Sequence, residues 1–256
     1  MIFRFFRPDY SFIISSQGWL VLNYTNINNK NDIIFYGNVP DEEMEKIKFK
    51  PLQLYPQAET NSALLEKIEE KEAQHLLYEL CERDVIFTGA GISKAANIAT
   101  QDDLMYDFGM DNIHKLVSLC TNKPEQLLQI FIKFTARLGL SRPTPAHQFV
   151  HRLVESNGCA LITENIDLLH QKTGSKVIFA FFPEADEIPT PDTTFLLGVG
   201  SPSRKDLIQK WHKNGTRIIA VSLNPPNLSG VRFEWVQADV QKFCHTPNPE
   251  VFKRGN

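Results

Sequence analysis

A short apolar run followed by a glycine-rich turn is the feature that most constrains how this chain can fold. Val85-Ile86-Phe87 is consecutive and apolar, which predicts a short buried strand. Gly89-Ala90-Gly91 follows it and allows a sharp turn whose backbone N–H groups face outward. We expect a helix to begin at Ile92 or Ser93, so that free N–H groups and the helix dipole create an anion site. A third glycine at the usual dinucleotide spacing is absent, so a plain tight turn is the alternative.

Composition limits the class of protein. The 256 residues are 42% hydrophobic and 22% charged, which is typical of a soluble globular chain with one large domain, with or without an appendage. A net charge of −3 argues against general nucleic-acid binding, and no apolar run is long enough to span a membrane. The four cysteines form no C-x-x-C pair, which argues against a zinc ribbon and predicts free thiols in a reducing, cytoplasmic compartment.

The N-terminal segment differs from the remainder of the chain. Ser11–Ser15 and Trp19–Tyr24 predict a hairpin, and Ile33–Tyr36 predicts a third strand. Structural cover is the plain role of this β-rich extension, and contact with a protein partner or a second copy of the chain is the alternative. The expected parts are the extension, 1–58, a main domain, 59–245, and a C-terminal tail, 246–256.

The main domain alternates apolar strands with helices. A helix is expected from Asn61, another after Asn122, and a third at Thr144-Pro145. After Val85–Phe87, the expected strands are Cys159–Thr163, Lys176–Phe182, Thr194–Val199 and Arg217–Leu223. This order predicts an α/β fold with a doubly wound, mostly parallel sheet that includes Leu161, Leu197 and Val221 beside the first strand. Ligands bind at the carboxyl ends of the strands in such folds.

Several motifs in order resemble the sirtuins, the NAD-dependent protein deacylases. Thr88–Ser93 resembles their first signature, and Thr163–His170 resembles the second, with Glu164 where the family usually has Gln. Further ordered matches are Pro143–His147, Gly200-Ser201, Val221–Pro225 and Gln237–Asp239. The resemblance covers about residues 61–245 and implies a Rossmann-type NAD-binding fold.

The resemblance also implies which residues surround the cofactor. Asn165 and Asp167 would line the nicotinamide and ribose pocket and are the candidate catalytic residues; helix capping is their plain alternative. The other implied cofactor-binding residues are Gly89, Ala90 and Gly91 at the pyrophosphate, Ser93 at the next helix, Glu164 beside a ribose, Gly200 and Ser201 at the adenosine ribose and phosphate, Ser222 and Leu223 at the adenosine end, and Asp239 and Val240 near the base.

Departures from the family pattern change the expected activity. The general base of the family is a His after a strand, and Phe181-Phe182 stands there in this chain. A phenyl ring cannot accept the proton that this base must take. Only about ten residues lie between Phe182 and the next strand, so no zinc module is expected. An arginine that helps to hold the cofactor in the family is replaced by Gln101-Asp102.

These observations predict a protein that binds NAD or ADP-ribose without protein deacetylase activity. An NAD glycohydrolase or ADP-ribosyl transferase using Asn165, Asp167 and Glu164 is a second hypothesis, because carboxylates stabilise an oxocarbenium-like centre. A non-catalytic interaction module that kept the fold is a third. His147 and His170 fall on expected helices and are interpreted as packed or capping side chains.

Overall fold

The computed structural model describes residues 2–6, 10–15, 17–26, 28, 30–49, 65–98 and 113–245. The chain forms two compact units, an N-terminal unit of 1–58 with 101–140 and a main unit of 59–100 with 141–256. One break between the units follows residue 58, and 101–140 group with the N-terminal segment rather than with the main unit. The expectations for Gln101-Asp102 and for the tail, 246–256, lie outside the described residues.

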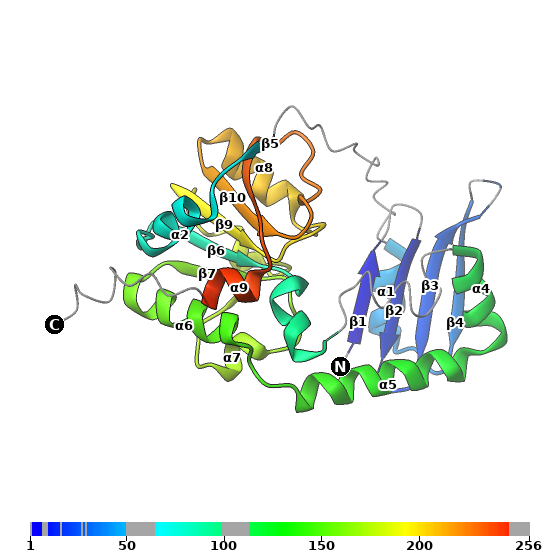
Figure 1. The fold of residues 1–256 in the computed structure, drawn as a ribbon. Helices are drawn as coiled ribbons and strands as arrows, with labels where there is room; N and C mark the ends of the chain where they lie inside the picture. The colour runs from blue at the N-terminus through cyan, green and yellow to red at the C-terminus, as the bar shows by residue number, and fades with distance from the viewer. Residues whose placement is uncertain are drawn as a thin grey trace. The chain divides into compact units, whose positions relative to one another are not determined.

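The N-terminal unit is a four-stranded antiparallel sheet with three described helices (Figure 1). Its strands, in sheet order, are β1 (Ile2–Phe6), β2 (Tyr10–Ser15), β3 (Leu20–Thr25) and β4 (Asn31–Tyr36). Its helices are α1 (Asp41–Phe49), α4 (Ile113–Asn122) and α5 (Pro124–Leu140). Helix α4 contacts β3 and β4, and α5 contacts β2. The predicted hairpin and third strand are confirmed, whereas β1 and α1 were not expected.

The main unit is built on a seven-stranded parallel sheet in the order β5-β11-β10-β9-β6-β7-β8. Its strands are β5 (Leu65–Lys67), β6 (Val85–Thr88), β7 (Ala160–Thr163), β8 (Ile178–Phe179), β9 (Thr193–Leu197), β10 (Arg217–Ser222) and β11 (Phe233–Gln237). The chain runs outward from β6 through β7 to β8, then returns to the other side of β6 for β9 to β11. The predicted doubly wound α/β fold is confirmed.

Helices cover both faces of this sheet (Figure 1). The helical segments are α2 (Glu70–Tyr78), η2 (Ala90–Ala96), α6 (Pro145–Asn157), α7 (Leu169–Lys172), η3 (Pro183–Ala185), α8 (Lys205–Lys213) and α9 (Val240–His245). Ile86 and Leu161 share one buried cluster with α2, α6 and α9. Phe87 and Ile162 share the other with α8, which buries Trp211 completely. This alternation follows from the period of two along a strand.

Three expectations for the sheet need correction. Leu65–Lys67 is an edge strand paired with β11, and the helix expected from Asn61 begins only at Glu70. Val221 lies on β10, which is separated from β6 by β9 and so is not its neighbour. Strand β11 was not expected, although Phe233 and Trp235 are buried on either side of the half-buried Glu234.

The cysteines and helices bear on the environment of the chain. All four cysteines are free thiols, and burial raises the pKa of Cys120 and Cys244 to about 12 and of Cys159 to about 11. Cys81 is half-buried rather than fully buried. Within the described ranges, no helix combines the length and hydrophobicity needed to cross a bilayer.

Candidate functional site at the carboxyl edge of the parallel sheet

The winding direction of the sheet reverses between β6 and β9, and the loops after these two strands meet there. A Cβ atom added to Gly91 would lie 2.8 Å from the Cα atom of Gly198. One added to Gly198, whose φ is +66°, would lie 2.6 Å from the backbone nitrogen of Ile92. Only glycine permits such an approach of two backbones. The glycines after β6 are therefore needed to close this junction.

The amides of the turn are only partly available to a ligand. The Gly89 N–H donates to the Leu197 carbonyl at 3.0 Å, and the Gly91 N–H donates to the Gly198 carbonyl at 2.9 Å. The sequence predicted that all three amides of the turn would meet a pyrophosphate. The N–H groups of Gly89 and Gly91 are already bonded within the chain, so they are not free donors for such a ligand. Among the described residues, the Ala90 N–H has no backbone acceptor. The following helix is a 3-10 helix that begins at Ala90, two residues before the expected start.

The segment that follows β7, Glu164–Leu168, has reversed polarity, and we call it the inverted loop. Asn165 and Asp167 are only 8% and 5% exposed, whereas Ile166 and Leu168 are 37% and 44% exposed. Leu168 also has φ of 59°, a left-handed conformation that is uncommon for residues other than glycine. Burying a polar group costs free energy unless the group is hydrogen-bonded, so the partners of Asn165 and Asp167 decide what this loop leaves open. Strained loops of this kind are found preferentially at functional sites.

Ser93 connects this loop to α6 through hydrogen bonds of defined direction. The Thr144 N–H donates to Nδ1 of His147 at 3.3 Å, so the ring proton is on Nε2, which lies 3.3 Å from Ser93 Oγ. Asn165 Nδ2 donates to the same oxygen at 3.1 Å. The Ser93 hydroxyl therefore donates its hydrogen bond to Asp167 Oδ2 at 2.5 Å. Ser93 is buried, and its hydroxyl uses its one donor and both acceptor positions on these three partners. It therefore positions the loop, and its hydroxyl is not free for the ligand contact expected from the sequence.

Asn165 and Asp167 differ in what they leave open. Asn165 Nδ2 also donates to the Gly89 carbonyl at 3.1 Å, and because a carbonyl only accepts, this bond fixes the orientation of the amide. Asn165 Oδ1 has no hydrogen-bond partner in the described part of the chain. Asp167 Oδ1 accepts from the N–H of Leu169, the first residue of α7, although the N-cap position itself is Leu168 and Asp167 stands one residue before it.

Two buried histidines lie behind the inverted loop. The ring centroids of His147 and His170 are 4.6 Å apart. Burial lowers the pKa of His147 to about 4, with Asp167 partly opposing the shift. Burial lowers the pKa of His170 to about 3, with a smaller contribution from the neighbouring His147. His147 forms a capping box with Thr144, as weighed from the sequence, and both rings are neutral near pH 7.

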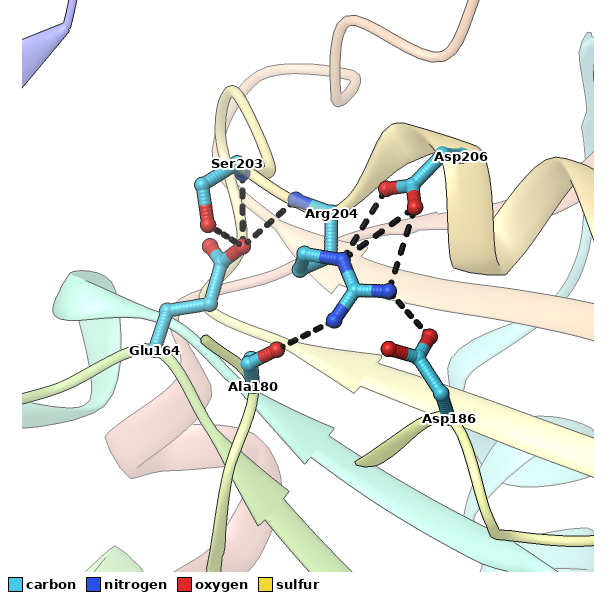
Figure 2. A network of polar contacts seen from close by, with 6 residues as sticks. All are labelled: Glu164, Ala180, Asp186, Ser203, Arg204 and Asp206. Carbon is cyan, nitrogen blue, oxygen red and sulfur yellow. Dashed lines mark hydrogen bonds and ion pairs between the residues drawn. The ribbon is translucent and has the colours of Figure 1, made fainter. Parts of the chain in front are cut away.

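Glu164 points toward the start of α8 and contacts it (Figure 2). Its Oε1 accepts from the N–H of Ser203 at 2.6 Å, from Ser203 Oγ at 2.7 Å and from the N–H of Arg204 at 3.3 Å. Burial raises the pKa of Glu164, while these donors favour its charged form. The carboxylate is therefore engaged by the chain itself at the position where a ribose contact was expected.

Arg204 extends this network to the segment after β8 (Figure 2). Its guanidinium donates to the Ala180 carbonyl at 2.7 Å and pairs with Asp186 and with Asp206, the latter at 3.0 Å. The Arg204 side chain is 16% exposed, whereas its two carboxylate partners are largely exposed. One side chain thus joins α8 to the segment between β8 and β9.

The remaining residues predicted from the sequence lie at the same edge but do not all face open space. They lie at the end of β10 or just after β9, β10 and β11: Gly200, Ser201, Ser222, Leu223, Asp239 and Val240. Gly200, Ser201 and Leu223 are exposed. Ser222 Oγ donates to the Asn224 carbonyl, Asp239 caps α9 through the N–H groups of Gln241 and Lys242, and Val240 is part of the core.

Aromatic side chains occupy the end of β8. Phe181 and Phe182 are each 49% exposed, and their ring centroids lie 5.3 and 5.6 Å from that of Phe179. The Ala180 N–H donates to the Thr163 carbonyl at 2.8 Å, so this segment lies beside the inverted loop. Among the described residues, no three His, Cys, Asp or Glu side chains are grouped to hold a metal ion. The lack of zinc stays a prediction.

Residues 89–188 match the model of the family described as the Sir2 family. This stretch, which is less than half of the chain, is similar to the Sir2 family. The match begins at the Gly89 turn and includes both Ser93 and the inverted loop. It also spans 101–140, which group with the N-terminal unit.

Similar Sir2-type proteins carry names that describe NAD-dependent chemistry. The chain is 31% identical over 113 residues to an NAD-dependent protein deacylase 2 of Archaeoglobus fulgidus, covering 42% of this chain and 44% of that protein. It is 32% identical over 102 residues to an NAD-dependent protein deacetylase 1 of Pyrobaculum aerophilum, covering 36% and 37%. The chain thus matches less than half the length of these relatives.

Solved Sir2 structures share the fold. A structure of Sir2 bound to acetylated peptide superposes with a TM-score of 0.52 at 22% identity, covering 69% of this chain and 96% of that one. A second sirtuin structure gives a TM-score of 0.54 at 20% identity, covering 74% and 100%. At this identity the likeness concerns the fold alone.

Sequence reasoning did not identify the residues that hold the site together. Arg204 and its partner Asp186 carry no local pattern that would reveal them, because their contacts join separate loops. Gln241 was also missed: its amide nitrogen donates to the Ile92 carbonyl at 2.7 Å and to Thr144 Oγ1 at 3.1 Å. Only contact information could have indicated these three.

Proposed function

We propose that the main unit binds NAD or ADP-ribose at the carboxyl edge of its parallel sheet and lacks protein deacetylase activity. The inverted loop carries this proposal, because it buries Asn165 and Asp167 while it exposes Ile166 and Leu168. Hydrogen bonds within the chain satisfy Asp167 and the amide nitrogen of Asn165 but leave Asn165 Oδ1 open, and a polar ligand at this strained loop would supply its donor. The names of the similar Archaeoglobus and Pyrobaculum proteins, both NAD-dependent, support the same ligand.

The free groups at this edge fit a nucleotide in part. Asn165 Oδ1 would accept from a ribose hydroxyl or from the carboxamide N–H of nicotinamide. The Ala90 N–H would donate to a phosphate oxygen. Bound NAD would bring a glycosidic bond to this loop. Asp167, held by Ser93 and Leu169, would orient the loop and add negative charge beside the sugar.

The lack of deacetylase activity is proposed from the residues at the end of β8. Phe181 stands where the resemblance expects the general base, and general-base help is typically worth about 10²- to 10⁴-fold in rate. His147 and His170 are buried behind the inverted loop, with pKa values of about 4 and 3, which makes both of them weak bases. Incubation with an acetyl-lysine peptide and NAD is expected to give no O-acetyl-ADP-ribose above the no-protein blank. A product signal that Asn165→Ala abolishes would contradict this part of the proposal.

Isothermal titration calorimetry with NAD and ADP-ribose tests the binding proposal. We expect the native chain to bind at least one of them and Asn165→Ala to weaken binding, since Asn165 also bonds Gly89 and Ser93. The matched control is Asn214→Ala, an exposed residue that ends α8 and precedes β10, at the opposite edge of the sheet. Absence of binding at millimolar ligand would refute the proposal and favour a non-catalytic interaction module.

NAD cleavage is the second candidate function, and Asp167 is the observation that favours it. Its carboxylate is buried, and in the described part of the chain it forms no ion pair with a cationic side chain. Such a carboxylate would stabilise positive charge that develops on a ribose as nicotinamide leaves. Release of free nicotinamide by the native chain, lost in Asn165→Ala, would support this function. Equal background release by both would exclude it.

A protein partner or a second copy of the chain at the N-terminal unit is also proposed. Strand β4 is an edge strand that pairs with β3 alone among the described strands. Its Ile33 and Phe35 side chains are 36% and 42% exposed, and an apolar edge strand is a ready surface for association.

A further inference from the structure

The network around Glu164 carries an excess of negative charge (Figure 2). The carboxylates of Asp186 and Asp206 pair with the guanidinium of Arg204, and the Glu164 carboxylate accepts from the backbone N–H of the same residue. Three carboxylates therefore gather around a residue with one positive charge. Even with Lys205, the next residue along α8, negative charge remains in excess.

This network borders the proposed nucleotide site. Strand β6 lies between β7 and β9, and Glu164 reaches from the end of β7 to Ser203 in the loop that follows β9. The Glu164 N–H also donates to the Thr88 carbonyl at 3.0 Å, next to the Gly89 turn. Glu164 therefore lies at the carboxyl end of β6. It follows Thr163, the last residue of β7, and precedes Asn165.

We propose that Glu164 is a specificity-determining residue that makes the site prefer the less anionic of its two ligands, intact NAD over ADP-ribose. The inference rests on the proposed function. Near neutral pH, NAD carries one net negative charge, because its pyridinium offsets one phosphate, whereas ADP-ribose carries two. A fixed carboxylate beside the site repels each ligand in proportion to its charge. A glutamine at this position, which the sirtuin resemblance makes usual, would not.

The matching substitution is Glu164→Gln. Glutamine keeps the side-chain length and one oxygen that can accept from the Ser203 N–H at 2.6 Å, but it removes the charge. With the dielectric constant of water, Coulomb repulsion over about 6 Å changes affinity by roughly threefold for each unit of ligand charge, and the lower effective dielectric constant near a protein surface makes this a lower bound. Salt screens this effect, whereas it leaves a purely structural effect largely unchanged.

Calorimetry with three probes, NAD, ADP-ribose and adenosine, tests the inference at pH 8 in low and high salt. In Glu164→Gln we expect ADP-ribose, with two charges, to bind roughly ninefold tighter, NAD, with one, roughly threefold tighter, and uncharged adenosine to be unaffected. High salt should shrink the gain for ADP-ribose. The matched control is Glu155→Gln, which removes the same charge from an exposed residue near the end of α6, at the opposite edge of the sheet. It should change none of the three affinities.

Each result separates this inference from the proposed function. Equal changes for all three probes, or weaker ADP-ribose binding, would overturn the role of Glu164 and leave nucleotide binding standing. No binding of any probe by the native chain would overturn both. If Glu164→Gln fails to fold, Asp206→Asn removes a charge from the same network at a side chain that is 67% exposed. It should strengthen binding in the same order, ADP-ribose more than NAD and NAD more than adenosine, with smaller factors, and equal changes for all three probes would overturn the inference.

Discussion

Acidification should destabilise the main unit through its two buried histidines. The folded-state pKa values of His147 and His170, about 4 and 3, lie below the value of about 6.5 expected for an unfolded chain. Between these limits the unfolded state binds more protons than the folded state, so stability rises with pH and is lost as the pH falls below about 6.5. At pH 5.5 the folded rings are still neutral, so each histidine costs about 1.4 kcal/mol, or about 3 kcal/mol together.

Urea denaturation at pH 7.5 and pH 5.5 measures this loss. The variant His170→Asn should retain only about half of the loss between the two pH values, whatever its own stability. The control His75→Gln removes a histidine whose side chain is 63% exposed on α2, and it should keep the native pH dependence. Equal stability of the native chain at both pH values, or an undiminished loss in His170→Asn, would refute the reasoning.

The remaining predictions concern the glycine junction and the N-terminal sheet. Gly198→Ala should destabilise the chain by roughly 1–3 kcal/mol or more in urea denaturation, because its φ is +66° and the new Cβ would meet the Ile92 nitrogen at 2.6 Å. Gly200→Ala is the matched control, since a Cβ there meets nothing within 4 Å, and equal losses would contradict the account of the junction. Gly91→Val should likewise lower the stability of the folded chain in the absence of any ligand, because its Cβ would meet the Gly198 backbone at 2.8 Å. If copies associate through β4, Phe35→Lys should shift sedimentation toward the monomer, and an unchanged associated state would exclude this surface.

Local sequence patterns were sufficient for the part of the fold that positions the site. The apolar run Val85–Phe87 is a fully buried strand, and Thr144-Pro145 caps and opens α6 as predicted. Each of these rests on residues adjacent in sequence, where backbone preference and burial agree. The alternation of apolar strands and helices then gave the parallel sheet, and with it the edge that carries Asn165.

Contacts between distant segments could not be predicted in this way. The three residues of β5 form a strand only because β11 offers its edge, while the spacing of Leu64, Leu65 and Ile68 favours a helix. The turn glycines were interpreted as amide donors, and the reason for them lies in Gly198, more than a hundred residues away in the chain. Glu164 was placed beside a ribose, since nothing local indicates that Ser203 would engage its carboxylate.

A crystal structure of the chain soaked with ADP-ribose tests the central claim most directly. The account predicts ligand density at the carboxyl ends of β6, β7 and β9, with a ligand hydroxyl or amide within hydrogen-bond distance of Asn165 Oδ1. Gly89 and Gly91 should keep their bonds to Leu197 and Gly198. Density for the ligand at another surface, with Asn165 unchanged, would contradict it.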